Sequence, residues 1–388
     1  MAFYGIMWDF DVVIIGGGPA GCMLAEKIGD EVSVLVVEED KEIGKPIKCA
    51  GFVSERCIKE ADAYKSILKQ KNKIVIHSPK GKSAVVNTKE NLFVIKRDKF
   101  DQIIFKRAIK KKKVEFELNT KAIRNDGNAI LLRNKNELKT VRARIIVGAD
   151  GALSNVAKWF SFPPVNTNLY AFQTYIPYNK EEVEVFWGKD IAPSFFSWII
   201  PENGTARIGL ASQENPYFYF KNFLNRFTDE KLKITGGVIP IGARKNTVKG
   251  NVLLVGDAAG QVKPTSGGGL YTGIVCAKEA ANVIKEAIFH RDIKLLSKYE
   301  RNWRKKIGRE LYFGMLIHKI RCRISDEERD RFVSFVSHCK ELVEDNADID
   351  YLSKIAKKMW KHPAAWREIL CIIPPYRFIP LMIRSIFK

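Results

Sequence analysis

A glycine-rich turn between two short apolar runs limits how this chain can fold more than any other feature of its sequence. The first run, residues 11–15, is rich in β-branched side chains and ends in the sequence GGGPAG at residues 16–21. A helical stretch follows through Ile28, and the second apolar run covers residues 32–37. The pattern predicts strand, tight turn, helix and strand, which is the opening unit of a parallel sheet with helices on its faces.

The glycines of this turn have the spacing of a dinucleotide-binding site. Gly16, Gly18 and Gly21 match Gly-x-Gly-x-x-Gly, in which the first permits the turn, the second lets backbone approach a pyrophosphate and the third allows close helix packing. The N–H groups at the start of the helix, around Ala20, are free to bind phosphate. Glu38 ends the second apolar run 22 residues after Gly16, where a carboxylate can accept hydrogen bonds from a ribose. We expect a dinucleotide site built from these five residues.

Three further motifs extend this prediction. A buried-looking strand ends at Gly256-Asp257, and a loop with three consecutive glycines, residues 267–269, leads into another helix. A second apolar strand also ends in an acid followed by glycine, at Asp150. A helix is predicted to begin at Arg97. Carboxylates and glycines at strand ends place charge and accessible backbone at the edge of a sheet where ligands bind.

The four motifs follow one another in the sequence as the glycine turn, Arg97, Asp150 and Asp257, and over residues 10–290 they resemble the glutathione-reductase-type flavoproteins of the aromatic hydroxylase branch. The resemblance implies that the glycine turn binds the ADP part of FAD and that Asp150 lies against the pyrophosphate. It also implies that Asp257 binds the ribityl chain and that Arg97 lies close to the cofactor from its helix. Further FAD contacts implied by the resemblance are Ala122, Gly268, Gly269 and Leu270.

Residues 42–51 are similar to a loop of the geranylgeranyl reductases of archaea and photosynthetic organisms. In that family the loop carries a cysteine beside the flavin ring, so the resemblance implies that Cys49, Ala50 and Gly51 contact FAD and that Cys49 is catalytic. The family usually continues Cys-Gly-x-Gly, whereas this chain has Phe52 after Gly51. Cys49 is either a proton donor or a small apolar residue that fills space against the ring.

The segment from Pro193 to Pro201 is similar to the substrate strand of the same reductases. It contains Phe196, Trp198 and Pro201 at positions that the resemblance assigns to the wall of a lipid tunnel. Ordinary core packing of strand aromatics is the alternative interpretation. The chemistry agrees with an apolar wall, because an isolated alkene is a poor hydride acceptor and its reduction needs a site that excludes water.

The resemblance to archaeal geranylgeranyl reductases implies an FAD-dependent enzyme that saturates geranylgeranyl chains of archaeal membrane lipid precursors by hydride transfer from the reduced flavin. The fold class that follows is α/β, or α+β in its two-domain organisation, with a Rossmann-like FAD-binding domain, an antiparallel-sheet substrate domain and a C-terminal helical region. We expect the FAD-binding domain in residues 1–72, 97–160 and 240–300, the substrate domain in 73–96 and 161–239, and the helical region in 301–388.

The net charge of +21, from 65 Lys and Arg against 44 Asp and Glu, indicates an anionic partner. Residues 285–323 hold 12 basic and 4 acidic residues, and residues 351–388 hold 8 and 1. In the second stretch the cations are mixed with aromatic and aliphatic side chains, a composition that suits the surface of an anionic membrane. A helical cap with a solvated lysine face is the alternative.

The sequence also argues against several classes of protein. The seven cysteines form no Cys-x-x-Cys pair and the five histidines lack metal-ligand spacing, so no metal is expected. No apolar run is long enough for a membrane span, and the first residues lack the basic start of a signal peptide. We expect a cytoplasmic protein that associates peripherally with the membrane.

The expected partners are an isoprenoid lipid substrate, an anionic membrane surface and an electron donor, either NAD(P)H or a small redox protein such as ferredoxin. Three alternatives compete with this interpretation: a flavin monooxygenase or halogenase of the same fold, a tRNA-binding flavoprotein, and an electron-transfer protein that reduces a membrane quinone. No nucleic acid is expected as a partner, because the sequence contains no recognisable RNA-binding module.

Overall fold

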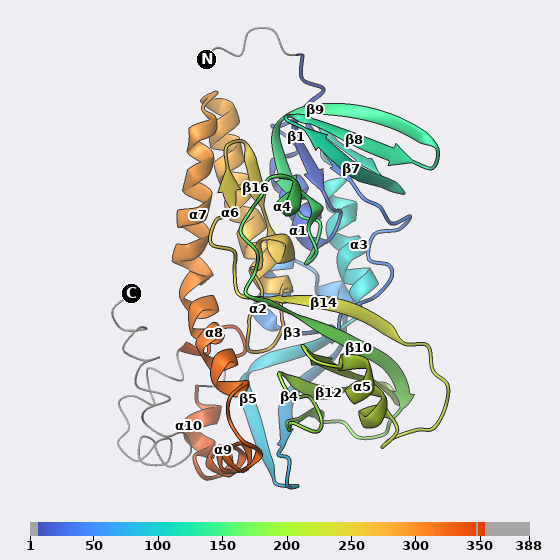
Figure 1. Ribbon diagram of the computed structural model, residues 1–388, viewed down its shortest axis with the longest axis vertical. Coiled ribbons are helices and arrows are strands. Elements are labelled where there is room, and N and C mark those ends of the chain that lie inside the picture. The colour runs from blue at the N-terminus through green and yellow to red at the C-terminus, as the bar shows by residue number, and fades with distance from the viewer. Residues whose placement is uncertain (1–6, 347, 354–388) are drawn as a thin grey trace.

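Two sheets and a column of C-terminal helices make up the structure, a computed structural model that describes residues 7–346 and 348–353 (Figure 1). Each sheet has eight strands. In the view of Figure 1 one sheet lies above the other, and the helices that follow residue 298 run along one side. The expected fold class, a Rossmann-like domain joined to a second sheet and a C-terminal helical region, is confirmed.

The first sheet contains the strands that the sequence predicted around the glycine turn. Its spatial order is β15 (Val248–Lys249), β16 (Val252–Leu254), β9 (Glu137–Gly148), β1 (Phe10–Ile15), β2 (Val34–Val37) and β6 (Val114–Glu117), and β9 also carries β8 (Ala129–Asn134) and β7 (Thr120–Asp126). β1 is parallel to both neighbours, with Val12 opposite Val34 and Ile145. All four residues of β2 are buried, as expected for a parallel strand that is covered on both faces.

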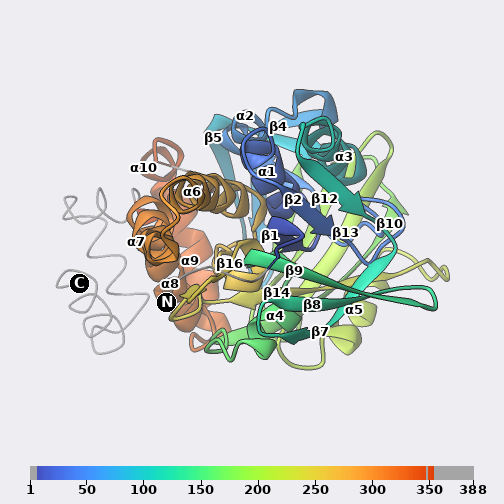
Figure 2. The same cartoon turned by 90° about the horizontal axis from the view of Figure 1, so that it is seen from above.

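Helices pack on this sheet beside the glycine turn. α1 (Pro19–Ile28) begins directly after Gly18, with Pro19 at its first position, where a missing N–H costs no hydrogen bond. α6 (Leu270–Phe289) lies beside α1 and shares one apolar core with it (Figure 2). The other helices of this domain are α2 (Glu55–Ala61), α3 (Arg97–Ala108) and α4 (Asn155–Trp159).

The second sheet is almost entirely antiparallel. Its spatial order is β14 (Thr235–Ile241), β10 (Thr167–Pro177), β13 (Thr205–Ser212), β12 (Phe196–Glu202), β11 (Val183–Phe186), β4 (Ile67–His77), β5 (Ser83–Ile95) and β3 (Phe52–Ser54). β11 and β4 are the exception, because they run parallel. α5 (Pro216–Leu224) packs on β10 and β13.

The boundary predicted at residue 72 needs correction. β3 and the first residues of β4 lie within the range 1–72 that was expected in the FAD-binding domain, but they belong to the second sheet. The physical reason is the length of β5, which pairs with β3 at Val94 and with the start of β4 at Ile95. Such pairing between distant segments cannot be read from the motifs alone.

The C-terminal helices connect the two sheets. α7 (Lys298–Trp303), a π turn at residues 304–308 and α8 (Arg309–Arg321) follow one another beside both sheets (Figure 1). α9 (Asp326–His338) packs on β5, and α10 (Lys340–Glu344) follows it. No helix in the described ranges is both long enough and apolar enough to cross a membrane. The predicted membrane-surface segment falls mainly in residues 354–388, which lie outside the described residues.

Candidate functional site

The glycine turn after β1 is closely packed at Gly16 and Gly21 and open at Gly18. Gly16 has a φ of +105°, and a Cβ there would overlap the carbonyl group of Ala149. A Cβ on Gly21 would overlap the Gly16 carbonyl oxygen, whereas a Cβ on Gly18 would meet no atom within 4 Å. The turn therefore needs Gly16 and Gly21 for its own packing and presents the backbone at Gly18 to a ligand.

Glu38 lies beside this turn, directly after β2. Its Oε2 atom accepts a hydrogen bond from the N–H of Gly17 at 2.7 Å, and its Oε1 atom accepts one from the N–H of Asp40 at 2.9 Å. Burial raises the pKa of Glu38, and the two backbone hydrogen bonds oppose this increase. The carboxylate predicted to bind a ribose thus lies at the glycine turn, at the end of the neighbouring parallel strand.

The second predicted motif contacts the first one at Ala20. A Cβ on Gly256 would lie 3.1 Å from the Ala20 Cβ, so the start of α1 is close to the turn after β16. Gly269 approaches Asp257 so closely that a Cβ on this glycine would lie 2.6 Å from the Asp257 Oδ1 atom. Leu270 is the first residue of α6, so the helix begins next to the Asp257 carboxylate.

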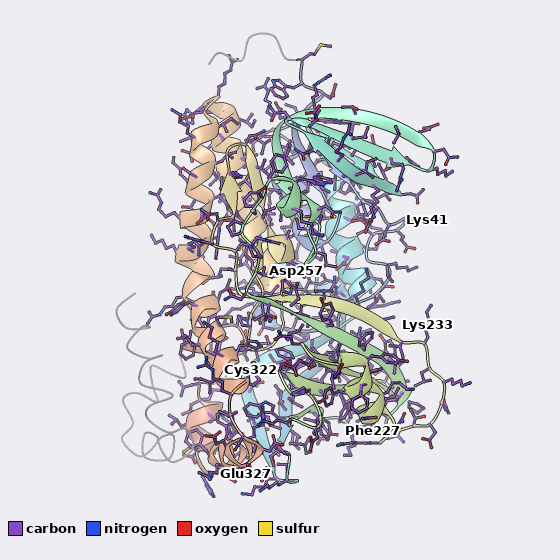
Figure 3. All side chains as sticks on the ribbon, in the orientation of Figure 1. Lys41, Phe227, Lys233, Asp257, Cys322 and Glu327 are labelled. Atoms are coloured by element: carbon purple, nitrogen blue, oxygen red, sulfur yellow. The ribbon has the colours of Figure 1, made fainter. Side chains whose placement is uncertain are left out.

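The Asp257 carboxylate forms no hydrogen bond within the part of the chain that the structure describes. It is partly buried near the middle of the molecule (Figure 3). Burial raises its pKa to about 6, and the nearby Arg97 charge opposes this increase. A carboxylate in this position can accept hydrogen bonds from the hydroxyl groups of a ligand.

Arg97 links predicted residues from distant parts of the chain. Its Nε and Nη2 atoms donate hydrogen bonds to the two carboxylate oxygens of Asp101 at 3.0 and 2.7 Å. The guanidinium also interacts with the Cys49 side chain and with the Asp257 charge. The structure therefore brings Cys49, Arg97 and Asp257 together in one place.

Arg207 on β13 holds the loop that carries Cys49, and the sequence did not single it out. Its Nη1 atom donates a hydrogen bond to the Ala50 carbonyl oxygen at 2.6 Å, and Nη2 donates one to the Ile95 carbonyl oxygen at 2.9 Å. Gly51 has a φ of +65°, and a Cβ there would overlap Nη1 of Arg207. A lone arginine on a strand carries no motif, so only the folded chain reveals this role.

Phe52, where the sequence departs from the geranylgeranyl reductase pattern, begins β3. It pairs with Val94 of β5, so it is a strand residue rather than part of the loop. Its side chain is partly buried and packs on the same apolar cluster as Ala50 and Phe196. The loop with Cys49 and the predicted substrate strand therefore pack on one apolar cluster.

Phe196 and Trp198 lie on one face of β12, and Pro201 lies on the other. Side chains alternate along a strand, so the register separates Pro201 from the two aromatic residues. The indole ring of Trp198 lies across Gly209, where a Cβ would overlap it. The structure brings Phe196 and Trp198 to the Cys49 loop and does not bring Pro201 there.

Several buried polar atoms in this region have no hydrogen-bond partner in the described residues. Among them are Nε1 of Trp198 and Oε1 of Gln173. Gln173 lies on β10 opposite Gly209, which is also opposite Trp198 on β12. An apolar wall with a few free polar atoms is typical of a ligand site, and Gln173 is a residue that the motifs did not indicate.

The two carboxylate oxygens of Asp150 have different surroundings, because one is hydrogen-bonded and the other is not. Oδ2 accepts hydrogen bonds from the N–H groups of Asn155 and Val156 at 2.7 and 3.1 Å, which caps α4, whereas Oδ1 is buried without a partner. Burial raises the pKa of Asp150. Arg244, another residue that the motifs missed, is buried and close enough for its charge to interact with Asp150.

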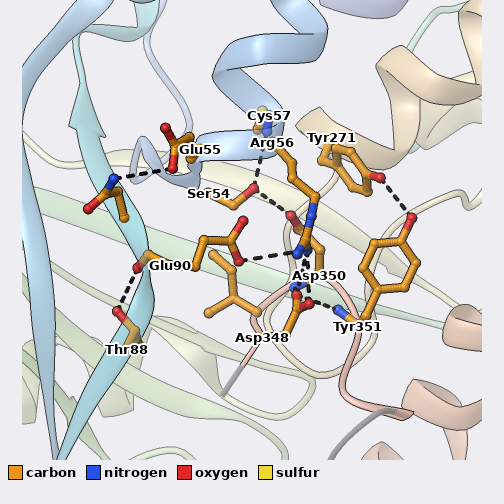
Figure 4. Close-up of polar contacts among 12 residues, drawn as sticks. Ser54, Glu55, Arg56, Cys57, Thr88, Glu90, Tyr271, Asp348, Asp350 and Tyr351 are labelled. Atoms are coloured by element: carbon orange, nitrogen blue, oxygen red, sulfur yellow. Dashed lines mark hydrogen bonds and ion pairs between the residues drawn. The ribbon is translucent and has the colours of Figure 1, made fainter. Parts of the chain in front are cut away.

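A buried polar cluster surrounds Asp350, near the end of the described chain, and Figure 4 shows its contact with Ser54. Nζ of Lys263 donates a hydrogen bond to Asp350 Oδ1 at 2.5 Å, and Ser54 donates one to the other oxygen. A Cβ on Gly268 would lie 2.9 Å from the Lys263 Cε atom.

Ala122, another residue predicted to contact FAD, lies on β7 within an apolar cluster, and 7% of its surface is exposed.

These features fit FAD. The open backbone at Gly18 would hold the phosphates of FAD, and the carboxylate oxygens of Asp257 and Asp150 that lack partners would accept hydrogen bonds from its hydroxyl groups. The apolar cluster that includes Trp198 also packs against Phe196 and against Ala50, the neighbour of Cys49. The described residues contain no group of three or more His, Cys, Asp or Glu arranged to hold a metal ion.

Solved structures share this fold. A geranylgeranyl bacteriochlorophyll reductase-like protein from Thermoplasma acidophilum superimposes with a TM-score of 0.81 at 24% identity, over 94% of this chain and 99% of that one. A p-nitrophenol 4-monooxygenase from Pseudomonas putida gives a TM-score of 0.69 at 16% identity, over 93% and 99%. The overall fold is therefore common to reductase-like and monooxygenase proteins.

Sequence comparison is more specific. The FAD binding domain family matches residues 9–220. An uncharacterized protein from Methanocaldococcus jannaschii is 32% identical over 372 residues, which is 91% of this chain and 95% of the relative. The digeranylgeranylglycerophospholipid reductase of Thermoplasma volcanium is 30% identical over 368 residues, 85% of this chain and 92% of the relative. The chain belongs to the FAD binding domain family and, within it, to the family of the digeranylgeranylglycerophospholipid reductases.

Proposed function

We propose that this protein is an FAD-dependent reductase that saturates double bonds of the geranylgeranyl chains in archaeal membrane lipid precursors. The observation that carries the proposal is that the Cys49 loop and the aromatic residues of β12 pack on one apolar cluster, with Cys49 next to Arg97. When bound, FAD supplies the hydride. The residues of the chain hold the lipid, exclude water and deliver a proton.

The apolar cluster is suited to an isoprenoid chain. Its buried members come from six strands of the second sheet and the segment before β12: Val94, Leu169, Ala171, Val183, Phe195, Trp198, Ile200, Ala211 and Ile241. An alkene offers no group for hydrogen bonding, so its binding depends on the burial of apolar surface. The same surface keeps water from the reacting carbons.

Cys49 is the proton donor in this proposal. One carbon of the double bond receives the hydride, and the Cys49 thiol gives its proton to the adjacent carbon. The thiolate left behind lies beside the Arg97 guanidinium, and it is protonated again from solvent. Asp101 holds Arg97 in this position through two hydrogen bonds.

The charge of the chain supports the assignment of an anionic membrane partner. The protein works at an anionic membrane surface as a peripheral protein and receives electrons from NAD(P)H or a small redox protein such as ferredoxin. The excess of 12 basic over 4 acidic residues in residues 285–323, which include α7 and α8, supports an anionic partner.

The test is anaerobic oxidation of the reduced flavin by the lipid. Enzyme reduced with dithionite is mixed with digeranylgeranylglyceryl phosphate, and the return of oxidised flavin absorbance is followed, with the fully saturated lipid as the control. Oxidation by the unsaturated lipid alone supports the proposal. If the flavin stays reduced with both lipids and reacts only with oxygen to oxygenate or halogenate an added substrate, the proposal fails and the monooxygenase alternative replaces it.

A further inference from the structure

Arg321, the last residue of α8, is a buried cation without a counterion. It is 5% exposed, and no carboxylate in the described residues lies within ion-pair distance of its guanidinium. Two other buried cations near the candidate site are neutralised: Lys263 by Asp350 and Arg97 by Asp101. Arg321 therefore adds a positive charge that its surroundings do not balance.

The guanidinium contacts the glycine loop and the predicted substrate strand at the same time. Nη2 donates hydrogen bonds to the carbonyl oxygens of Thr265 at 2.9 Å and Pro264 at 3.4 Å. Cζ lies 4.6 Å from the ring centre of Phe195, which stacks on Phe196 at 4.2 Å. The Nη1 atom is buried and has no partner in the described residues.

The neighbouring titratable groups do not supply a negative charge. Burial lowers the pKa of His318 to about 4, with a smaller effect of the Arg321 charge, so this histidine is neutral at pH 7. Arg329 repels Arg321, and Cys322 is a thiol whose pKa burial raises. Burial lowers the pKa of Arg321 itself to about 10, which still leaves it protonated at neutral pH. A buried charge without a counterion destabilises a fold, so a ligand that brings negative charge is expected to relieve this cost.

The orientation of the loop suggests how the charge acts. Both carbonyl groups point at Arg321, and in a trans peptide the N–H lies opposite the carbonyl. The N–H groups of Thr265 and Ser266 therefore point away from Arg321. The positive end of each peptide dipole faces that opposite side of the loop. The same loop ends at Gly269, against Asp257.

We propose that Arg321 is a positioning residue for the flavin, and that its unbalanced charge, acting directly and through the peptide groups of the Pro264–Gly269 loop, stabilises the reduced anionic form. Two electrons and one proton convert oxidised FAD to this singly charged form. The proposal rests on FAD binding and not on the lipid. A role in binding the lipid phosphate is less compatible with the structure, because Nη1 is buried and the guanidinium lies against the aromatic rings of Phe195 and Phe196.

The experiment measures the midpoint potential of the FAD-loaded protein at pH 7 by equilibration with a reference dye. In Arg321→Met the reduced flavin should lose at least tenfold in stability relative to the oxidised flavin, which lowers the two-electron potential by about 30 mV or more. Arg321→Lys, which keeps the charge, should retain most of the wild-type potential. Lys71→Met is the matched control, because it removes a cation that is 6% exposed and paired with Glu181 in the second sheet, and it should leave the potential unchanged.

An unchanged potential in Arg321→Met would overturn the proposal. Arg321→Met could also keep the wild-type potential but bind digeranylgeranylglyceryl phosphate more weakly, with unchanged affinity for uncharged geranylgeraniol. That result would overturn the proposal as well, because it would assign Arg321 to the lipid headgroup. If Arg321→Met does not retain FAD, the wild type is compared with free FAD. The pH at which the reduced flavin takes up its second proton should then lie at least one unit lower in the protein, and an equal or higher pH would contradict the proposal.

Discussion

The Arg207 guanidinium donates a hydrogen bond to the Ala50 carbonyl oxygen at 2.6 Å. A residue in the middle of the second sheet thus holds the loop that carries Cys49. The same side chain forms an ion pair with Glu202 and is 3% exposed. The position of Cys49 beside Arg97 therefore depends on the second sheet as well as on the FAD-binding domain.

Replacement of Arg207 by Met should destabilise the fold and loosen this loop. The change leaves Glu202 without its partner, and removal of one member of a buried ion pair costs about 3 to 5 kcal/mol. We expect the free energy of unfolding in urea to fall by about 3 kcal/mol. Lys180→Met is the control, because Lys180 is 66% exposed in its ion pair with Glu184 and should cost less than about 1 kcal/mol. Equal losses in the two variants would contradict this account.

The Gly51→Ala change separates backbone strain from steric overlap. Gly51 and Gly127 have φ values of +65° and +60°, but a Cβ would overlap Arg207 only at Gly51, since nothing lies within 4 Å at Gly127. Gly127→Ala should cost roughly 1 to 2 kcal/mol from its left-handed backbone. Gly51→Ala should cost more and should reduce the amount of FAD that copurifies. Similar stabilities and FAD contents in both variants would show that Arg207 does not clamp the loop.

Cys49→Ala should lower turnover while the fold and FAD content stay intact. General acid catalysis contributes about 10²- to 10⁴-fold, so the rate of flavin oxidation by the lipid should fall by at least about 100-fold. The rate in Cys49→Ser should lie between those of the wild type and Cys49→Ala, because the serine hydroxyl is a weaker acid than the cysteine thiol. A wild-type rate in Cys49→Ala, measured with fully loaded flavin, would leave the thiol only a space-filling role.

Asp257 should make the FAD-free protein less stable as the pH rises. Its folded pKa is about 6 instead of 3.8, so the folded state binds the proton more tightly than the unfolded state. The stability that protonation provides is fully present below pH 3.8 and is lost between about pH 4 and 6. The shift corresponds to at most about 3 kcal/mol. In urea titrations at pH 4.5 and 7, the difference between wild type and Asp257→Asn should change by about 2 kcal/mol, since part of the effect is already lost at pH 4.5. A pH-independent difference would refute the assignment.

Local motifs predicted much of this molecule. Tight turns and strand ends require particular residue types nearby in the sequence. Such local patterns marked the glycine turn at Gly16, the loop with Cys49, and the carboxylates of Glu38, Asp150 and Asp257. The second sheet and its aromatic strand were also predicted in outline, although the strand register places Pro201 on the opposite face from Phe196.

Residues that act across the fold were missed. Arg207, Arg244 and Arg321 are single arginines in ordinary strand, loop and helix sequence, and their partners are backbone carbonyl groups from distant segments. Backbone carbonyl groups occur at every position, so no residue pattern marks them. The boundary at residue 72 was misplaced for a similar reason, because strand pairing over a long distance depends on the whole sheet.

Mass spectrometry of the lipid product tests the central claim most directly. FAD-loaded enzyme reduced with dithionite is incubated without oxygen with digeranylgeranylglyceryl phosphate, and Cys49→Ala and dithionite with free FAD serve as controls. The account predicts lipid masses that increase in steps of two hydrogens with the wild-type enzyme and not with free FAD. An unchanged lipid mass, with the flavin fully reduced throughout, would contradict it.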